Sequence, residues 1–154
     1  MDKQARVETI DREQIITGLN ELLEAERAGV ATLARLREDA PAEYLEDLKR
    51  IGQDEAWSCA GLHRSIKTLG GEPTGKTGDF ADKVMALEGL IERLELLSKG
   101  QKWVSRRLER LVETDTPAEV HEFLVEMLRR HDENIAWCDD QAAELREAQQ
   151  QASF

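Results

Sequence analysis

The stretch DREQIITGLNELLEAERAGVATLARL (residues 11–36) is typical of a long amphipathic helix. It begins with Asp11, and Gln14 three residues later makes the start similar to a capping box. Pro41 disfavours helix at the residue before it, so we expect this first helix to end near Asp39. Apolar residues recur at intervals of three and four, which places them on one face; they are Ile15, Ile16, Leu19, Leu22, Leu23, Val30, Leu33 and Leu36.

Two further stretches repeat this spacing of apolar residues. The second predicted helix runs from Pro41 to Leu69, and the glycine pair at residues 70–71 ends it. The third predicted helix runs from Asp79 to about Thr114. Gly89 and Gly100 weaken this third helix locally, so a break near either glycine would not be surprising.

The fourth helix has the clearest start of the four. Residues 116–119 read TPAE, which combines an N-cap threonine, a proline in the first turn and a glutamate at the third position. Its apolar spacing continues to Leu145. The glutamine-rich end has no core pattern, so we predict a frayed C-terminus over residues 150–154.

These four helices predict an all-α protein, since no stretch alternates as a strand would. Helices of about 28–33 residues each would be roughly 42–50 Å long. Two of the connections are short enough only for antiparallel hairpins, whereas the glycine-rich stretch over residues 70–79 predicts a long crossover between helices two and three. We therefore predict a single four-helix bundle domain over residues 11–149, preceded by a disordered or loosely packed N-terminus over residues 1–10.

Composition and charge restrict the function classes. The chain has 154 residues, 40% of them apolar and 34% charged, which suits one globular domain. A formal net charge of -11 repels phosphate backbones and anionic lipid, so we expect no nucleic acid and no membrane as partner. No apolar run approaches the roughly 20 residues of a membrane-spanning helix, and the polar start MDKQ does not resemble a signal peptide. With two cysteines, the chain is expected to be a reduced, cytoplasmic protein.

Polar side chains interrupt the apolar stripes near the middle of the helices. Glu26, Glu55 and His131 lie about midway along helices one, two and four. A lone buried carboxylate costs on the order of several kcal/mol unless it is paired, protonated or bound to a cation. A polar residue on one stripe is most often a partly exposed seam position, but three interruptions at matching depth favour a shared polar centre. The same stripes also carry Ser58 on helix two, Ser98 with Gln101 beside it on helix three, and Asn134 on helix four.

The segments around these residues resemble the ferritin-like superfamily, with bacterioferritin and rubrerythrin-like bundles as the nearest types. Residues 19–26 (LNELLEAE) are similar to the bacterioferritin first-helix pattern, in which the last Glu is an iron ligand. Residues 54–58 (DEAWS) resemble the family's Asp-Glu-x-x-His segment, and residues 126–137 (EMLRRHDENIAW) resemble its second Glu-x-x-His segment. The resemblance spans about residues 15–145 and implies a ferritin-like four-helix bundle.

That family builds a di-iron site from one Glu on each of two helices and a Glu-x-x-His pair on each of the other two. Carried over by position, Glu26 and Glu55 match ligands. Ser58 and Asn134 stand at the two His positions, and His131 stands at a bridging Glu.

The resemblance therefore implies a reduced metal site without an intact di-iron ferroxidase centre. Glu26, Glu55 and His131 remain as ligands, enough for one iron, manganese or zinc ion with open positions. Ala56 stands at the position of the bacterioferritin haem methionine, which argues against haem. No catalytic residue follows from the pattern. The candidate supporting residues are Glu95, Ser58, Ser98 and Asn134; Ser98 falls at the helix-three Glu, three residues from Glu95.

The resemblance also bears on assembly and on the cysteines. The chain ends too soon after helix four for the short fifth helix that helps build storage cages, so a homodimer is expected. In the family's topology helices two and four run antiparallel, which would separate Cys59 and Cys138 by more than the roughly 7 Å between bridged Cα atoms. We interpret both cysteines as small core residues.

A second hypothesis requires no metal. The bundle would then be a binding or dimerisation module that keeps only the ferritin-like fold. Glu26 or Glu55 would be protonated or paired with a charged His131. The polar centre would be held by hydrogen bonds among Glu26, Ser58, Ser98, His131 and Asn134.

One motif we set aside is GGEPTGKT (residues 70–77), which fits the phosphate-loop pattern letter for letter. Phosphate binding by this loop requires a strand before it and a helix immediately after it. Here a long helical pattern precedes the loop. We therefore expect no bound nucleotide.

Overall fold

The structure, a computed structural model, describes residues 11–152, and all of its regular elements in that range are helices. The predicted all-α class is confirmed. The predicted N-terminal segment, residues 1–10, lies outside the described residues, as do residues 153–154. The elements are α2 (Arg12–Asp39), the 3₁₀ helix η1 (Ala42–Tyr44), α3 (Leu45–Thr68), α4 (Phe80–Met85), α5 (Leu90–Leu111) and α6 (Ala118–Ala152).

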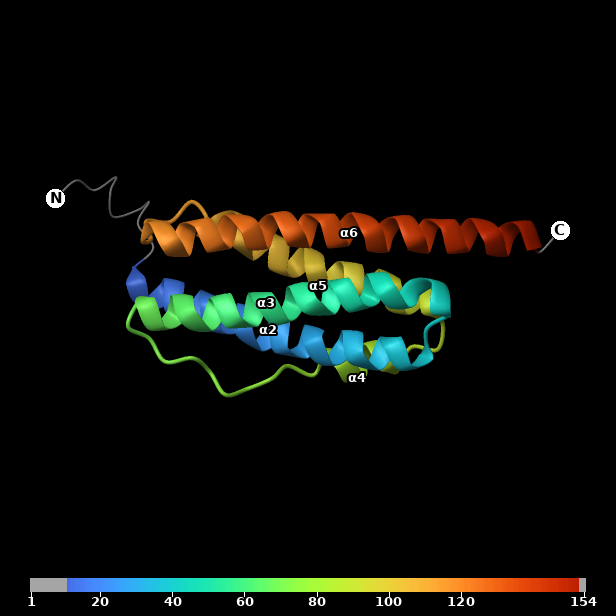
Figure 1. Cartoon of the computed structure of the whole chain (residues 1–154), viewed down its shortest axis with the longest axis horizontal. Helices are drawn as coiled ribbons and strands as arrows, with labels where there is room; N and C mark the ends of the chain where they lie inside the picture. The colour runs from blue at the N-terminus through green and yellow to red at the C-terminus, as the bar shows by residue number, and fades with distance from the viewer. Residues whose placement is uncertain (1–10, 153–154) are drawn as a thin grey trace.

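Four long helices form the predicted bundle (Figure 1). Helices α2 and α3 form one antiparallel hairpin and α5 and α6 form the other, while α3 also packs against α6 and α2 against α5. The connection after α3 returns along the side of the bundle to the short α4, so that α5 starts at the same end as α3. This is the long crossover predicted between helices two and three.

The predicted ends of the first helix agree with the structure, whereas those of the third and fourth helices differ from it. At the first helix, Oδ1 of Asp11 accepts the backbone N–H of Gln14 at 2.9 Å, and the Gln14 side chain accepts the N–H of Asp11, so the capping box is present. The third predicted helix is broken at Gly89, whose backbone is extended. As a result α5 has 22 residues, shorter than the predicted length, whereas α6 has 35.

Gly100 does not break α5, because its role is in packing. A Cβ atom at this position would lie 2.7 Å from the Phe80 ring of α4. The missing side chain thus lets α4 lie against α5. At the C-terminal end, α6 continues to Ala152, past the predicted end of the domain at residue 149, and residues 150–152 are exposed.

The crossover is held against α2 by polar contacts. The Arg27 guanidinium donates to the carbonyls of Thr74 and Lys76, and the Asn20 side chain bonds Thr74 N–H at 2.8 Å. The stretch over residues 70–77 is therefore a loop that follows a helix. Residues 11–152 contain no strand, so the strand that a phosphate loop requires does not precede it.

Two apolar clusters fill the bundle on either side of one polar layer. Residues such as Leu23, Leu62 and Met127 form the first cluster, and residues such as Leu33 and Cys138 form the second. Along each long helix, the polar positions lie in sequence between the two clusters. None of the helices within residues 11–152 has the length and apolar run that crossing a membrane requires.

Both cysteines are free thiols. Cys138 is fully buried in the second cluster, as predicted for a core residue. Cys59 is half-buried and packs against the first cluster.

Candidate metal centre

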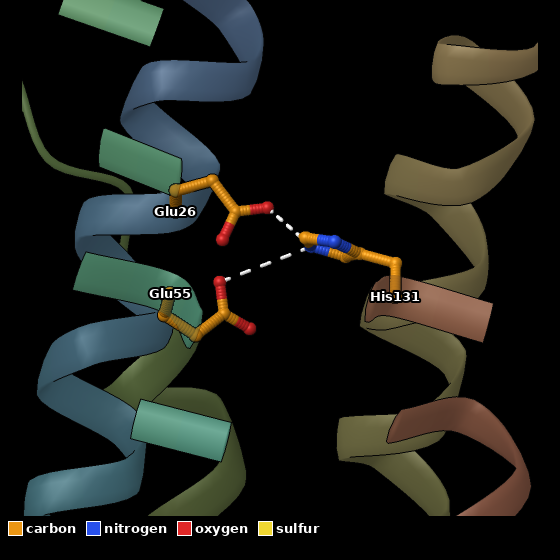
Figure 2. A group of neighbouring side chains, drawn as sticks. All are labelled: Glu26, Glu55 and His131. Atoms are coloured by element: carbon orange, nitrogen blue, oxygen red, sulfur yellow. Dashed lines mark hydrogen bonds and ion pairs between the residues drawn. The ribbon is translucent and has the colours of Figure 1, made fainter. Parts of the chain in front are cut away.

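Three titratable side chains from three helices meet in the polar layer. Glu26 of α2, Glu55 of α3 and His131 of α6 are 1%, 3% and 1% exposed. One ligand atom from each lies within 4.8 Å of the others. Figure 2 shows the two carboxylates facing the edge of the imidazole ring. The side chains that the sequence placed at a common depth are thus brought together.

The orientation of His131 is fixed by its own helix. Its Nδ1 lies 2.9 Å from the Met127 carbonyl oxygen, one turn earlier in α6. A carbonyl oxygen only accepts, so Nδ1 carries the proton of this hydrogen bond. Nε2 therefore points into the centre, 2.6 Å from Oε1 of Glu26 and 4.0 Å from Oε2 of Glu55. This arrangement, with one ring nitrogen anchored and the other presented, is common for histidines that bind metals.

Opposing effects act on the protonation of His131. Burial lowers its pKa, but the charge and hydrogen bond of Glu26, the Met127 carbonyl and the charge of Asp54 together raise the pKa above its ordinary value. In the protein without an ion, Nε2 is therefore favoured in its protonated form and donates to Glu26. An ion at the centre would replace that proton.

Glu55 is held in place from two sides. Nε2 of Gln101, on α5, donates to its Oε1. On the other side lies Gly29 of α2, where a Cβ atom would come within 2.9 Å of the Glu55 carboxylate carbon. The sequence pattern singled out Gln101 only as a neighbour of Ser98, and it missed Gly29. A glycine inside a strongly helical pattern was the available signal, because it costs about 1 kcal/mol relative to alanine and often marks a close approach.

Several buried oxygen atoms of the layer have no hydrogen-bond partner within residues 11–152. They are Oε2 of Glu26, Oγ of Ser58 and Oε1 of Gln101. A buried polar atom left in this state costs about 1–3 kcal/mol. Carboxylate, hydroxyl and amide oxygens bind cations or accept protons, so the residues present fit a bound ion and its water ligands.

The predicted supporting residues differ in their burial and in their hydrogen-bond partners. Ser58 is fully buried one turn beyond Glu55. Ser98 is buried, but its hydroxyl donates to Asp139 at 2.5 Å. The Asn134 side chain donates to Asp54 at 3.1 Å and accepts from Arg50 at 2.8 Å, so charged neighbours along α3 engage the amide.

Glu95, predicted as a supporting residue, does not face the polar layer in this structure. Its side chain is 46% exposed and paired with Arg146 of α6. Ser98 and Gln101 occupy the inward face of α5, and Glu95 lies on the outward face.

As it stands, the centre offers two carboxylates and one imidazole. Carboxylates suit hard cations, and imidazole suits iron, copper, nickel and zinc. Three protein ligands leave coordination positions open for water or another molecule.

Comparison with known proteins agrees with this architecture. The chain belongs to the family described as a domain of unknown function (DUF6306), whose model matches residues 13–140. It is similar to a crystal structure described as that of ferritin like, diiron-carboxylate proteins from Bacillus anthracis str. Ames, with 24% identity and a TM-score of 0.60 over 91% of this chain and 98% of that chain. No curated protein matches. The predicted ferritin-like fold is confirmed.

Proposed function

We propose that this member of the DUF6306 family binds one transition-metal ion, iron, manganese or zinc, through Glu26, Glu55 and His131. The observation that carries the proposal is the convergence of three buried ligand atoms within 4.8 Å. The unpaired Oε2 of Glu26 supports it, because an ion would give this buried oxygen a partner.

Different residues of the chain position the ligands that would hold such an ion. His131 presents Nε2 because its Nδ1 is anchored on Met127. Gln101 and Gly29 fix the direction of the Glu55 carboxylate. When bound, the ion supplies a Lewis acid, and iron or manganese also supplies a redox centre.

One ion per chain is proposed rather than two. The relative from Bacillus anthracis is described as a diiron-carboxylate protein. By resemblance, Ser98 and Asn134 stand at ligand positions of a di-iron site. Here Ser98 donates to Asp139, and Asn134 forms hydrogen bonds with Asp54 and Arg50. Within the described residues, the cluster that could hold a metal has three members.

Metal analysis tests the proposal. Protein purified without chelator, and protein reconstituted anaerobically with Fe(II), Mn(II) or Zn(II), should contain about one ion per chain. Glu26→Gln and His131→Gln should lose the ion. Glu95→Gln and His63→Gln are matched controls, because both parent side chains are exposed, and they should retain it. Absence of all three metals after reconstitution overturns the proposal.

A second candidate function is a metal-free binding or dimerisation module. It is favoured by the hydrogen bonds already present in the layer, from His131 to Glu26 and from Gln101 to Glu55. Replacing Glu26, Glu55 and His131 together by Leu or Met distinguishes the metal-free module from the metal-binding protein. The module requires unchanged partner binding and equal or higher stability, since apolar residues often replace buried ion pairs without loss.

Assembly and location are further proposals. We propose a homodimer that acts in the cytoplasm and binds neither nucleic acid nor membrane. The net charge of -11 supports the last two points. Light scattering coupled to size-exclusion chromatography should give twice the chain mass of 17.5 kDa.

A further inference from the structure

A pocket of about 480 Å³ opens between α2, α4 and α5, and Glu26 and Glu55 are among the residues that line it. Its volume lies within the roughly 300–1,000 Å³ typical of small-molecule pockets. His131 does not line it. The pocket thus reaches the polar layer from the α2 and α5 side, whereas the imidazole enters from α6.

The walls of the pocket are apolar. Ala28 of α2 and Leu97 and Val104 of α5 are buried wall residues, and Phe80 of α4 closes one side. Phe80 can lie there because Gly100 has no side chain in its way. An occupant with an apolar or aromatic body would bury its surface against these residues.

Two residues that line the pocket carry hydrogen-bond acceptors that have no donor within residues 11–152. Oε1 of Gln101 and Oε2 of Glu26 are both buried and unpaired, and both residues line the pocket. The orientation of the Gln101 amide is fixed, because its Nε2 donates to Oε1 of Glu55. The flipped amide would instead place the Gln101 oxygen against the Glu55 oxygen, and both atoms only accept. A hydrogen-bond donor on an occupant would give these oxygens the partner that they lack.

The rim does not require a charged occupant. Two of its acids are already paired, Glu21 with Arg107 and Asp79 with Lys83. Trp103 lies at the rim with 39% of its surface exposed. A neutral molecule can therefore enter past an aromatic side chain.

We propose that this pocket binds a small neutral molecule with an apolar or aromatic body and one hydroxyl or N–H group, which donates to Gln101 and Glu26. The nearness of that group to an ion rests on the proposed function. The pocket and its unpaired acceptors do not depend on the proposed function.

Two fluorinated probes test the inference. 4-Fluorophenol carries a donor, and 4-fluoroanisole has the same ring without one. In protein kept free of metal by chelator, ¹⁹F line broadening should show saturable binding of 4-fluorophenol, with 4-fluoroanisole at least about fivefold weaker because the acceptors stay unpaired. Absence of binding, or equal binding of the two probes, overturns the inference.

Pocket-filling variants locate the binding. Ala25→Phe and Leu96→Trp fill the pocket from α2 and from α5, so each should weaken 4-fluorophenol binding at least about tenfold. Ala136→Phe, on an exposed position of α6, is the matched control and should bind normally. Undiminished binding by both folded filling variants overturns the inference.

Manganese separates this inference from the proposed function. Mn(II) held by Glu26, Glu55 and His131 should speed the ¹⁹F relaxation of bound 4-fluorophenol. Binding of the probe by protein that takes up none of Fe(II), Mn(II) and Zn(II) supports the pocket and contradicts the proposed ion site. Binding of Mn(II) without binding of the probe supports the proposed ion site and contradicts the inference about the pocket.

Discussion

Gly29 of α2 lies directly against the carboxylate of Glu55 on α3: a Cβ atom at position 29 would stand 2.9 Å from the carboxylate carbon and from Oε2. Real Cβ atoms do not approach so closely. The missing side chain therefore leaves the space that the Glu55 carboxylate occupies inside the bundle. Helix packing and the geometry of the candidate centre depend on the same position.

Gly29→Ala should harm the protein although alanine favours helix. Alanine gains up to about 1 kcal/mol of helix propensity. Overpacking against Glu55 costs about 1–3 kcal/mol. We expect unfolding in urea to show no gain and up to about 2 kcal/mol of loss, together with weaker Zn(II) binding in a competition titration.

Gly18→Ala on the same helix is the matched control, because its Cβ would lie 3.7 Å from Leu111 in ordinary contact. It should stabilise the protein. A Gly29→Ala variant as stable as Gly18→Ala would contradict the close approach.

The pair of His131 and Glu26 should show strong coupling in the metal-free protein. Replacing either residue by Leu leaves its partner buried without compensation, which costs about 3–5 kcal/mol. The double variant should lose much less than the sum of the two single losses. Urea unfolding of the four proteins in chelator measures this coupling, and additive losses would show that the 2.6 Å contact contributes nothing.

Ser58→Ala should not destabilise the metal-free protein. The Ser58 hydroxyl is buried without a partner among the described residues, so its removal should gain up to about 1 kcal/mol. Ser105→Ala is the control, because the Ser105 hydroxyl donates to Asp132 at 2.7 Å and should cost about 1 kcal/mol when lost. Equal losses in thermal unfolding would reveal a partner of Ser58.

Alkylation of Cys59 should be slow near neutral pH. Burial, with the negative charge of Glu26 added to it, raises the pKa of Cys59 to about 11 from 9.0. The thiolate is the reactive form, so at pH 8 the thiolate population should be about 100-fold smaller than that of an unperturbed thiol. The rate with iodoacetamide should therefore rise about tenfold per pH unit up to pH 11.

Glu26→Gln should speed this reaction by removing one cause of the raised pKa. Mass spectrometry of the alkylated peptide measures both effects. Cys138 is the internal reference, since its pKa is raised further, to about 12, and its side chain is fully buried. Rapid alkylation of Cys59 at pH 7 would contradict the described burial.

Local sequence patterns predict the four long helices of the bundle and the depth of the polar layer. Asp11 and Gln14 encode the first helix start, because capping acts within a few residues. The two glycines of the third predicted helix marked two positions for a break, and the break is at Gly89. Glu26, Glu55 and His131 could be found because each interrupts a local apolar stripe at mid-helix. That interruption can be recognised without knowing which helices are neighbours.

The pairing of polar atoms in and around that layer depends on how the helices pack together. Glu95 and Ser98 are three residues apart on α5, yet one pairs with Arg146 outside the bundle and the other with Asp139. Asn134 bonds to Asp54 and Arg50, and Gln101 reaches Glu55. Such pairings depend on the rotation and approach of whole helices, which side-chain periodicity leaves free and which close contacts such as Gly29 against Glu55 fix.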